Sequence, residues 1–401
     1  MLRTACGACA GSQLEVFLDL GKTPLANTYP ASVDETETFY PLQLGRCGNC
    51  GLVQMMEVVP DEIIYGDDYG FYSGGSQAQR NYHLRGADWL LKRYTEPARR
   101  SMLEIACNDG ALLKHFVDAG CPALGIDPAA PAQGAIDSGL PVRREAFTAA
   151  LARDLRDDSG PRGLIIAYNS MAHISDLSDV LTGIWALMDK DSVAVIEVQY
   201  LPDLIAGNMI GQVYHEHRYF HSLTSFKHAA ELHQLYVADV QLIELQGGGI
   251  RIHLTADPDM EPNPGVGRVL NSERWLTQEA TYSGMQGRVD RNRDHLLDLV
   301  SAELDAGRQV AGYAAAAKAT TILNYYGISS TTLPYVADTT SYKWGRYVPG
   351  VKIPIVPPSE VDTGTRLLLT ANYLPHLLRA DTGFLERGGH WLIAEPAPML
   401  I

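Results

Sequence analysis

The sequence lacks the features of a membrane protein or a nucleic-acid-binding protein. No apolar run reaches the roughly 18–20 residues that a transmembrane helix requires, and no charged-then-apolar leader opens the chain. Basic residues are also scarce, since 32 Lys and Arg stand against 47 Asp and Glu, for a net charge of −15. Such a surface repels phosphate backbones and anionic lipid. We therefore expect a cytoplasmic protein, a monomer or weak homo-oligomer, whose partner is a small molecule and neither nucleic acid nor membrane.

Cysteine is scarce too, and most of it is clustered. Of six cysteines, four form two Cys-x2-Cys pairs near the start of the chain: Cys6, Cys9, Cys47 and Cys50. In a chain without a leader this spacing favours zinc over disulfides, because reducing conditions preserve thiolates and each pair supplies two ligands. Unrelated thiols or a redox pair are the alternatives. With four sulfur ligands no coordination position stays open for chemistry, so the sequence predicts a structural zinc site.

The pattern of apolar residues predicts an α/β protein with several domains. At 401 residues the chain is too long for one ordinary core. From residue 101 onward, short apolar segments alternate with amphipathic helical segments, which predicts a parallel sheet covered by helices. A second strand–turn–helix pattern, "RQVAGYAAAAKATTILNYYGI", lies further along. We predict an N-terminal zinc-binding module (1–65), a central Rossmann-like domain (66–240) and a C-terminal Rossmann-like α/β domain (241–401).

The segment "LEIACNDGALL" indicates a ligand site in the central domain. Glu104 lies on a predicted strand, a tight turn at Asn108–Gly110 opens a helix, and Asp127 ends the next strand. Ligands of doubly wound sheets bind at the carboxyl ends of strands, where an acid can hold ribose hydroxyls. The G-x-G-x-x-G pattern of dinucleotide-binding folds is missing. An acidic turn suits a sulfonium cation better than a pyrophosphate, which favours S-adenosylmethionine, although such a turn is also a common strand–helix connector.

Several segments, in order along the whole chain, resemble the nucleotide-sugar C-methyltransferases. These bacterial enzymes methylate C3 of 4-keto deoxysugars carried on thymidine diphosphate. The resemblance rests on "FLDLGKTPLANTY", "YPLQLGRCGNCGLVQ", "EIACNDGALL", "NSMAHISDLSDV", "YHEHRYF" and "GRYVPGVKIPI". It implies a central methyltransferase domain and a third domain that helps to hold the nucleotide. It also implies the residues of the donor pocket: Glu104, Asn108, Gly110, Asp127, Asn169 and His173.

The segment "GQVYHEHRYF" (211–220) has three interpretations. If it is extended, His215 and His217 point to the same side, as two zinc ligands can, but a third ligand is not evident. It could also be a solvated polar turn. The resemblance supplies the third interpretation. A ketone at C4 makes the C3 proton acidic, its removal gives an enolate that attacks the sulfonium methyl, and histidine is the natural base near neutral pH.

The resemblance assigns roles around this base. His217 removes the proton, while His215 could instead polarise the ketone, and the sequence does not separate the two histidines. A tyrosine of the glycine-rich segment 65–76 is expected to reach into the site. The expected catalytic residues are His217, Tyr214, Glu216, His215, Tyr72 and Tyr69. Candidate partners for a diphosphate are Lys318, Lys343 and Arg346.

Three other functions remain compatible with these patterns. The acceptor could be a different secondary metabolite, methylated on oxygen or carbon. The third domain could add ketoreduction with NADPH, although "GYAAAA" is a weak signal for a dinucleotide. A non-catalytic binding protein could keep the same fold and zinc site. We expect the first function, a C-methyltransferase of a 4-keto deoxysugar nucleotide in antibiotic or other secondary-metabolite biosynthesis.

Overall fold

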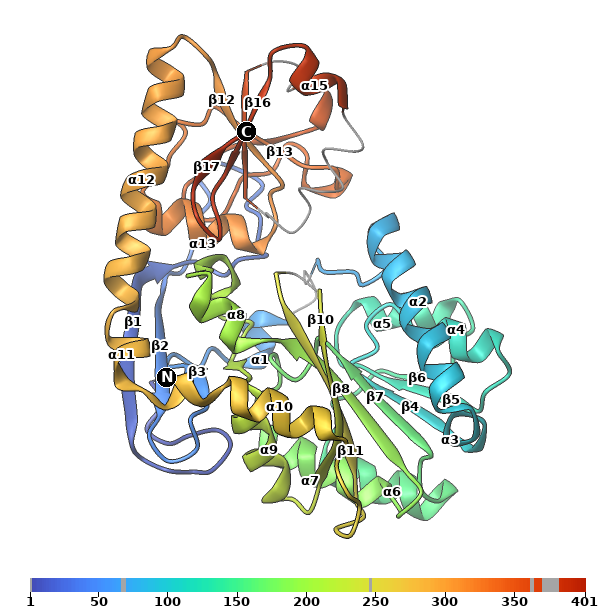
Figure 1. Ribbon diagram of the computed structural model, residues 1–401. Helices are drawn as coiled ribbons and strands as arrows, with labels where there is room; N and C mark the ends of the chain where they lie inside the picture. Colours follow the sequence, from blue (N-terminus) through green and yellow to red (C-terminus); the bar gives the residue numbers. More distant parts are fainter. Residues whose placement is uncertain (1, 66–69, 245–246, 361–363, 370–381) are drawn as a thin grey trace.

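A computed structural model describes residues 2–65, 70–244, 247–360, 364–369 and 382–401. Figure 1 shows three parts: an N-terminal sheet, a central sheet covered by helices, and a third α/β unit beside which the long helix α12 (Met285–Asp305) runs. Among the described residues, no helix has both the length and the apolar character needed to cross a bilayer.

The N-terminal module is a small antiparallel sheet that includes a strand from the central domain. Its own strands are β1 (Leu14–Thr23), β2 (Tyr40–Cys47) and β3 (Val53–Met55), and the fourth is β9 (Tyr219–Phe220). Strands β3 and β9 pair antiparallel along their length. Because β9 directly follows "YHEHR", the zinc-binding module fixes the position of that segment.

The central sheet has seven strands in the order β10-β11-β8-β7-β4-β5-β6, of which β4 to β8 run parallel. All five residues of β7 (Leu164–Tyr168) are buried, as expected of a strand covered on both faces. The other parallel strands are β4 (Met102–Ile105), β5 (Ala123–Ile126), β6 (Val142–Arg143) and β8 (Val193–Gln199). The predicted parallel sheet is therefore present.

The central sheet continues past the boundary that we predicted at residue 240. Strand β10 (Tyr236–Ile243) spans that position, and β11 (Gly249–Thr255) pairs with both β10 and β8. This antiparallel hairpin belongs to the central sheet because all seven residues of β11 are buried between its two neighbours. The last residue of the central sheet along the chain is therefore Thr255.

The helices of the central domain begin and end where capping residues allow. Helix α2 (Gln77–Arg93) starts at a capping box of Ser76 and Gln79, and α9 (Leu223–Glu231) starts at the Ser222 cap. The other described helices of this domain are α3 (Thr95–Arg100), α4 (Leu113–Asp118), α5 (Pro131–Asp137), α6 (Ala149–Ser159), α7 (Leu177–Leu187) and α8 (Leu201–Ala206), and α1 (Asp61–Ile64) precedes them at the end of the zinc-binding module. Helices α10 (Pro264–Ser272) and α11 (Glu279–Ser283) lead into α12.

The third domain contains a six-stranded sheet in the order β14-β13-β12-β15-β16-β17. Its strands are β12 (Val310–Tyr313), β13 (Val336–Ala337), β14 (Ile355–Val356), β15 (Thr365–Leu368), β16 (His390–Ile393) and β17 (Met399–Leu400). The first five are parallel and follow the 3-2-1-4-5 order of a Rossmann fold. The predicted second Rossmann-like domain is confirmed.

The zinc-binding module shares a core with each of the other two domains. One apolar cluster joins Cys6 and Leu52 to buried residues of the central sheet such as Ile105. Another joins Leu18 of β1 to Ile322 of α13 (Ala317–Tyr326). The small module therefore packs between the two larger domains and fixes their relative position.

A buried carboxylate, Glu303 at the end of α12, fastens this helix to the third sheet. Three groups contact it: the Arg308 guanidinium at 2.5 and 2.8 Å, His390 Nδ1 at 2.9 Å, and the Thr365 hydroxyl. The hydrogen bonds from Arg308, followed by those from Thr365 and His390, lower the pKa of Glu303 to about 2. The stabilisation from a carboxylate with a depressed pKa is complete above about pH 5 and is lost as pH falls toward 2.

Glu303→Gln should lower the free energy of unfolding by about 1–3 kcal/mol at pH 7, the scale for lost hydrogen bonds to a charged group. The difference from wild type should shrink as pH falls through 4 toward about 2, because the wild-type carboxylate then becomes protonated. Urea unfolding followed at several pH values measures this. Glu386→Gln, at an exposed position of the same domain, is the control. Equal stability of Glu303→Gln and wild type at pH 7 would contradict the assignment.

Candidate active site

The turn after β4 has the geometry of a ligand-binding loop. Its backbone adopts positive φ at Ala106 (57°), Asn108 (51°) and Gly110 (73°). At Gly110 a side chain would be strained, because φ is 73° and a Cβ atom would lie 2.5 Å from the end of the Leu140 side chain. Asp127, at the end of β5, accepts a hydrogen bond from the Asn108 backbone N–H at 2.8 Å. The predicted donor-pocket residues of these two strands thus lie together.

Two acceptor atoms beside this turn are buried without a partner. Glu104 on β4 is 4% exposed, and its Oε2 has no hydrogen bond within the described part of the chain. The same holds for Oδ1 of Asn169, which follows β7 with φ of 53°. Burial, and then the charge of Asp127, raises the pKa of Glu104 well above its usual range. A ligand with positive charge and donor groups, as S-adenosylmethionine has, fits this acceptor-rich pocket.

The loop before α2 is tied onto the donor turn. Ser73 N donates to Asn108 Oδ1 at 2.9 Å, and Asn108 Nδ2 donates to Phe71 O at 3.2 Å. Gly74 N donates to Asp109 Oδ2 at 2.9 Å. Residues 70–75, which we call the donor loop, therefore cover the predicted cofactor site.

The "YHEH" segment is a buried turn. His217 N donates to Tyr214 O at 2.9 Å, and the exposed fractions of His215, Glu216 and His217 are only 1%, 3% and 2%. Interpretation as a solvated surface turn is therefore wrong. Interpretation as an extended metal-binding pair is also wrong, because the turn separates the two histidines. His215 Nε2 faces Pro41 O of the N-terminal module at 3.1 Å.

Hydrogen bonds define the tautomer of His217. Its Nδ1 lies 2.7 Å from Gln212 O, and a carbonyl oxygen can only accept, so Nδ1 carries the proton. Nε2 is then the basic atom, and it accepts from the Tyr214 hydroxyl at 2.7 Å. Burial, and then the neighbouring His173, lowers the pKa of His217 well below its usual value. His217 is therefore a neutral imidazole whose lone pair points at a half-buried phenol.

His173 packs against His217, and Glu216 is a buried carboxylate of the same turn. The Glu216 carboxylate accepts from Asn27 Nδ2 at 2.7 Å, and burial raises its pKa to about 7. The His173 ring packs edge-on against the His217 ring, with centroids 4.9 Å apart. His173 was predicted near the donor pocket, and in the structure it contacts His217 of the "YHEH" turn. Burial lowers its pKa to about 4, so it is neutral as well.

Tyr72, one of the two predicted tyrosines of the 65–76 segment, does not join this cluster. Tyr72 is 47% exposed, and the ring neighbours of His217 in the described chain are Tyr214, His173 and Phe220. Tyr69 lies outside the described residues. Tyr65, at the start of the same segment, reaches in instead, with its hydroxyl 3.3 Å from His173 Nδ1.

Sequence reasoning missed several residues of the cluster. Besides Tyr65, they are Asn27, which holds Glu216, and Gln199, whose Nε2 lies 3.5 Å from His217 Nε2. They come from segments about 20 to 190 residues away and carry no chemical motif. For Asn27 a signal did exist, since it is part of "LANTY", one of the segments that carry the family resemblance.

The four predicted zinc ligands converge. All four sulfur atoms lie within 4.8 Å of one another, with Cys6–Cys50 and Cys9–Cys47 at 3.6 Å. Tetrahedral zinc with Zn–S bonds of 2.3 Å places sulfurs roughly 3.8 Å apart. The cluster thus fits one zinc ion, and it is the only group of three or more such ligands within metal-binding distance among the described residues.

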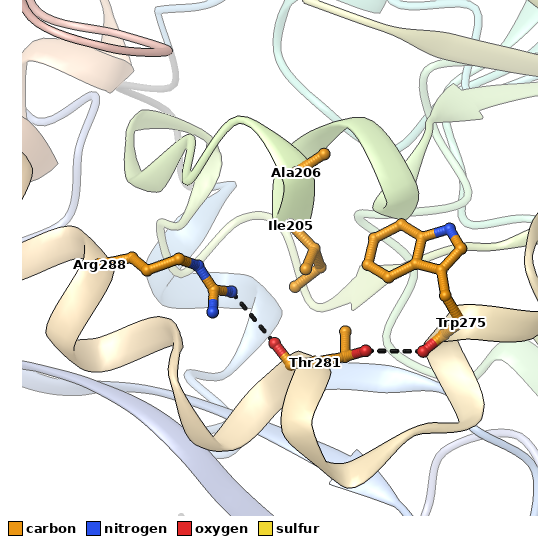
Figure 2. A pocket seen from close by; sticks show the side chains of 5 residues that line it. All are labelled: Ile205, Ala206, Trp275, Thr281 and Arg288. Atoms are coloured by element: carbon orange, nitrogen blue, oxygen red, sulfur yellow. Dashed lines mark hydrogen bonds between the residues drawn. The ribbon is translucent and has the colours of Figure 1, made fainter.

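A cavity of about 380 Å³ lies apart from these sites. Figure 2 shows it between α8 and the segment of η2 (Arg274–Thr277), α11 and α12, with lining residues Ile205, Ala206, Trp275, Thr281 and Arg288. Arg288 donates to Thr281 O at 3.1 Å and to Asn208 Oδ1 at 2.9 Å. Asn208 has positive φ and precedes the segment that leads into "YHEH". These contacts support that segment.

Comparison with known proteins gives three matching family models. They are "Methyltransferase domain" over residues 77–240, "C-methyltransferase C-terminal domain" over 244–396 and "Putative zinc binding domain" over 6–65. C-methyltransferase NovU from Streptomyces niveus is 30% identical over 405 residues, covering 99% of this chain and 96% of NovU. The chain belongs to the C-methyltransferase family. This C-methyltransferase uses S-adenosylmethionine as its methyl donor and carries a zinc-binding N-terminal domain.

Solved structures resemble the C-methyltransferase only distantly. The PH0226 protein of Pyrococcus horikoshii is 14% identical, with a TM-score of 0.38, over 46% of this chain and 94% of that protein. Magnesium protoporphyrin IX methyltransferase of Synechocystis, solved with bound S-adenosylmethionine, is 13% identical. Its TM-score is 0.33, and the match covers 48% of this chain and 88% of that protein. Similarity this low carries no inference about function.

Asp127→Ala should weaken S-adenosylmethionine binding by about 1–3 kcal/mol, the scale for leaving buried polar partners unpaired. In this C-methyltransferase Asp127 accepts from Asn108 N and from Ala129 N, so the variant also loosens the donor turn. Titration calorimetry measures the affinity. Asp137→Ala on the exposed face of α5 is the matched control. Equal affinity in Asp127→Ala and wild type would indicate that S-adenosylmethionine binds elsewhere in the protein.

Proposed function

We propose that this C-methyltransferase methylates C3 of a thymidine-diphosphate-linked 4-keto deoxysugar through an enolate, in the biosynthesis of an antibiotic or related secondary metabolite. The observation that carries the proposal is the neutral His217 whose lone pair meets the Tyr214 hydroxyl, in a buried cluster that joins the donor domain to the other two. Carbon methylation next to a ketone needs a base of this kind, because the acceptor carbon becomes nucleophilic only after its proton is removed.

His217 is the proposed base, and Tyr214 is its proposed relay. Tyr214 is half-buried while His217 is 2% exposed, so the phenol is the more accessible group of the pair. As the C3–H bond breaks, the tyrosine oxygen takes the proton and passes its own to His217 Nε2. The electron pair of the broken bond becomes the enolate. S-adenosylmethionine, when bound, supplies the electrophilic methyl group.

Glu216 is proposed to stabilise the enolate oxygen. A carboxyl group with a pKa of about 7 is partly protonated at neutral pH and can then donate a hydrogen bond. Asn27 holds one carboxylate oxygen at 2.7 Å, which leaves the other for the acceptor. Tyr65 and His173 line the same cluster. His215 faces the N-terminal module, so its proposed role is to support the turn rather than to polarise the ketone.

Two features of the third domain favour the proposal that it binds the nucleotide. Ala314, directly after β12, has φ of 70°. Asp338 directly follows β13, where Rossmann folds place the acid that holds ribose hydroxyls. Of the three candidate partners for the diphosphate, two donate hydrogen bonds to backbone carbonyl groups. Lys343 Nζ donates to Ala315 O at 2.9 Å, and Arg346 donates to Tyr29 O at 3.0 Å. Lys318, in the first turn of α13, lies near His217 and near the buried carboxylate of Glu395. We propose that the three cations together attract the diphosphate.

A second activity, ketoreduction with a nicotinamide dinucleotide, has two structural features in its favour. The strand order and the terminal Asp338 are those of dinucleotide-binding folds. Ala314 and Ala317, however, occupy positions where the usual turn has glycine, and a methyl group hinders close approach of a pyrophosphate. Methyl transfer to a nucleotide-linked sugar remains our proposal.

Thermal unfolding with single ligands tests the proposal, because a ligand that binds the folded state raises the melting temperature. S-adenosylhomocysteine and thymidine diphosphate should each stabilise the protein. Stabilisation by NADPH would favour the added reductase. No shift with any thymidine or other nucleoside diphosphate, together with a shift for S-adenosylhomocysteine, would favour a different secondary-metabolite acceptor.

A further inference from the structure

One hydrogen bond connects the third domain directly to the donor loop. The Tyr342 hydroxyl donates to Gly70 O at 2.7 Å, across 272 residues of sequence. The Tyr342 ring also touches Gly70, since a Cβ atom at Gly70 would lie 3.2 Å from the hydroxyl and 3.4 Å from the ring. Tyr342 belongs to η3 (Ser341–Lys343), which follows β13 and Asp338.

Tyr342 is supported from beneath by buried groups. Its ring packs edge-on against Tyr29, with centroids 6.4 Å apart. Tyr29 is 3% exposed, and its hydroxyl donates to Ala315 O at 2.8 Å. Lys343 Nζ donates to the same carbonyl and lies 4.7 Å from the centre of the Tyr29 ring. These buried residues therefore fix the position of Tyr342, while Tyr342 itself remains 45% exposed and is not part of a core.

The donor loop is thus held at two points. Asn108 and Asp109 of the donor turn bind its middle through Phe71, Ser73 and Gly74. Tyr342 binds its beginning from the opposite domain. A loop that is fastened on both sides loses less conformational entropy when a ligand binds under it, because part of that entropy is already lost.

We propose that Tyr342 is a positioning residue for the methyl donor: from the third domain it holds the donor loop over the donor turn of the central domain. It acts through Gly70 and the loop and does not touch the reacting atoms. Donor affinity in the central domain then depends on a side chain of the domain that we propose for the acceptor. This inference rests on donor binding alone and does not require the acceptor to be a nucleotide sugar.

Tyr342→Phe in the full chain tests the hydrogen bond while it keeps the ring. The dissociation constant for S-adenosylhomocysteine, measured by calorimetry, should rise about 2- to 10-fold, the scale for one lost hydrogen bond. Amide hydrogen exchange in peptides that cover residues 70–76 should become faster. The KM for S-adenosylmethionine should rise in proportion while kcat changes less, because the base and the acceptor contacts are untouched.

Tyr335→Phe is the matched control, because the Tyr335 hydroxyl donates to Glu360 O at 3.1 Å within the third domain. It should leave both the affinity and the exchange of residues 70–76 unchanged. Gly70→Ala probes the same contact from the other side, since the added methyl group presses on Tyr342, and it should also weaken binding. Unchanged affinity and exchange in Tyr342→Phe, or equal losses in Tyr335→Phe, would overturn the proposal.

Discussion

Replacing His217 with asparagine should lower turnover by about 10²–10⁴-fold, the usual contribution of a positioned base. Asparagine is similar in size and can still donate to Gln212 O, but it has no lone pair of comparable basicity to accept a proton through Tyr214. Methylation rate and exchange of the C3 hydrogen with deuterated solvent should fall together, because both require the enolate. Affinity for S-adenosylmethionine should change little, since the donor turn follows β4.

His215→Asn is the control for this experiment. Its ring packs against Tyr40 and its Nε2 faces Pro41 O, so the variant should affect stability more than exchange. If exchange persists in His217→Asn and disappears in His215→Asn, the two assignments are reversed. An O-methyltransferase would show no C3 exchange even in the wild type. If neither variant affects turnover, the "YHEH" turn is not catalytic.

Replacing Cys47 with serine should abolish zinc binding and unfold the N-terminal module. Cys47 is 0% exposed and stands 3.6 Å from Cys9 in the sulfur cluster. Structural zinc sites contribute about 10–16 kcal/mol of apparent binding free energy, as much as the whole folding stability of a typical domain. Elemental analysis should find one zinc per chain in the wild type and none in the variant. Thermal unfolding should begin at a lower temperature.

Cys121→Ser provides the comparison, because Cys121 is a free cysteine of the central domain, outside the sulfur cluster. It should retain one zinc per chain. Stoichiometric zinc in Cys47→Ser, or its absence from the wild type with all four thiols free, would contradict the predicted site.

The features that could be predicted from sequence are those encoded by neighbouring residues. Cysteine spacing predicted the sulfur cluster, and strand–helix alternation predicted both Rossmann-like domains. The hairpin of β10 and β11 was not predicted. Helix α9 ends at Glu231, Gln234 has φ of 57°, and Tyr236 already starts β10. Its place in the central sheet depends on pairing with β8, which no local pattern encodes.

The candidate site also contains features that neighbouring residues encode and features that only long-range packing decides. The donor turn is local, so Asn108, Gly110 and Asp127 could be predicted together. The sequence could not distinguish His215 from His217, because both lie in the same turn and have the same chemistry. Only packing separates them, since one ring faces strand β2 and the other faces Tyr214. Tyr65 lies in the 65–76 segment from which a tyrosine was expected, but no local pattern distinguishes it from the other tyrosines of that segment.

The pairing of β3 with β9 has a consequence for inhibitor studies. Because β9 begins two residues after His217, removal of zinc from the N-terminal module would release the strand that anchors the proposed catalytic turn. A chelator should therefore inactivate the enzyme slowly, at the rate at which the module comes apart, and regardless of substrate concentration. Such time-dependent inhibition would resemble that of a metalloenzyme, although the ion would lie outside the chemistry, and added zinc would restore activity only as fast as the module refolds.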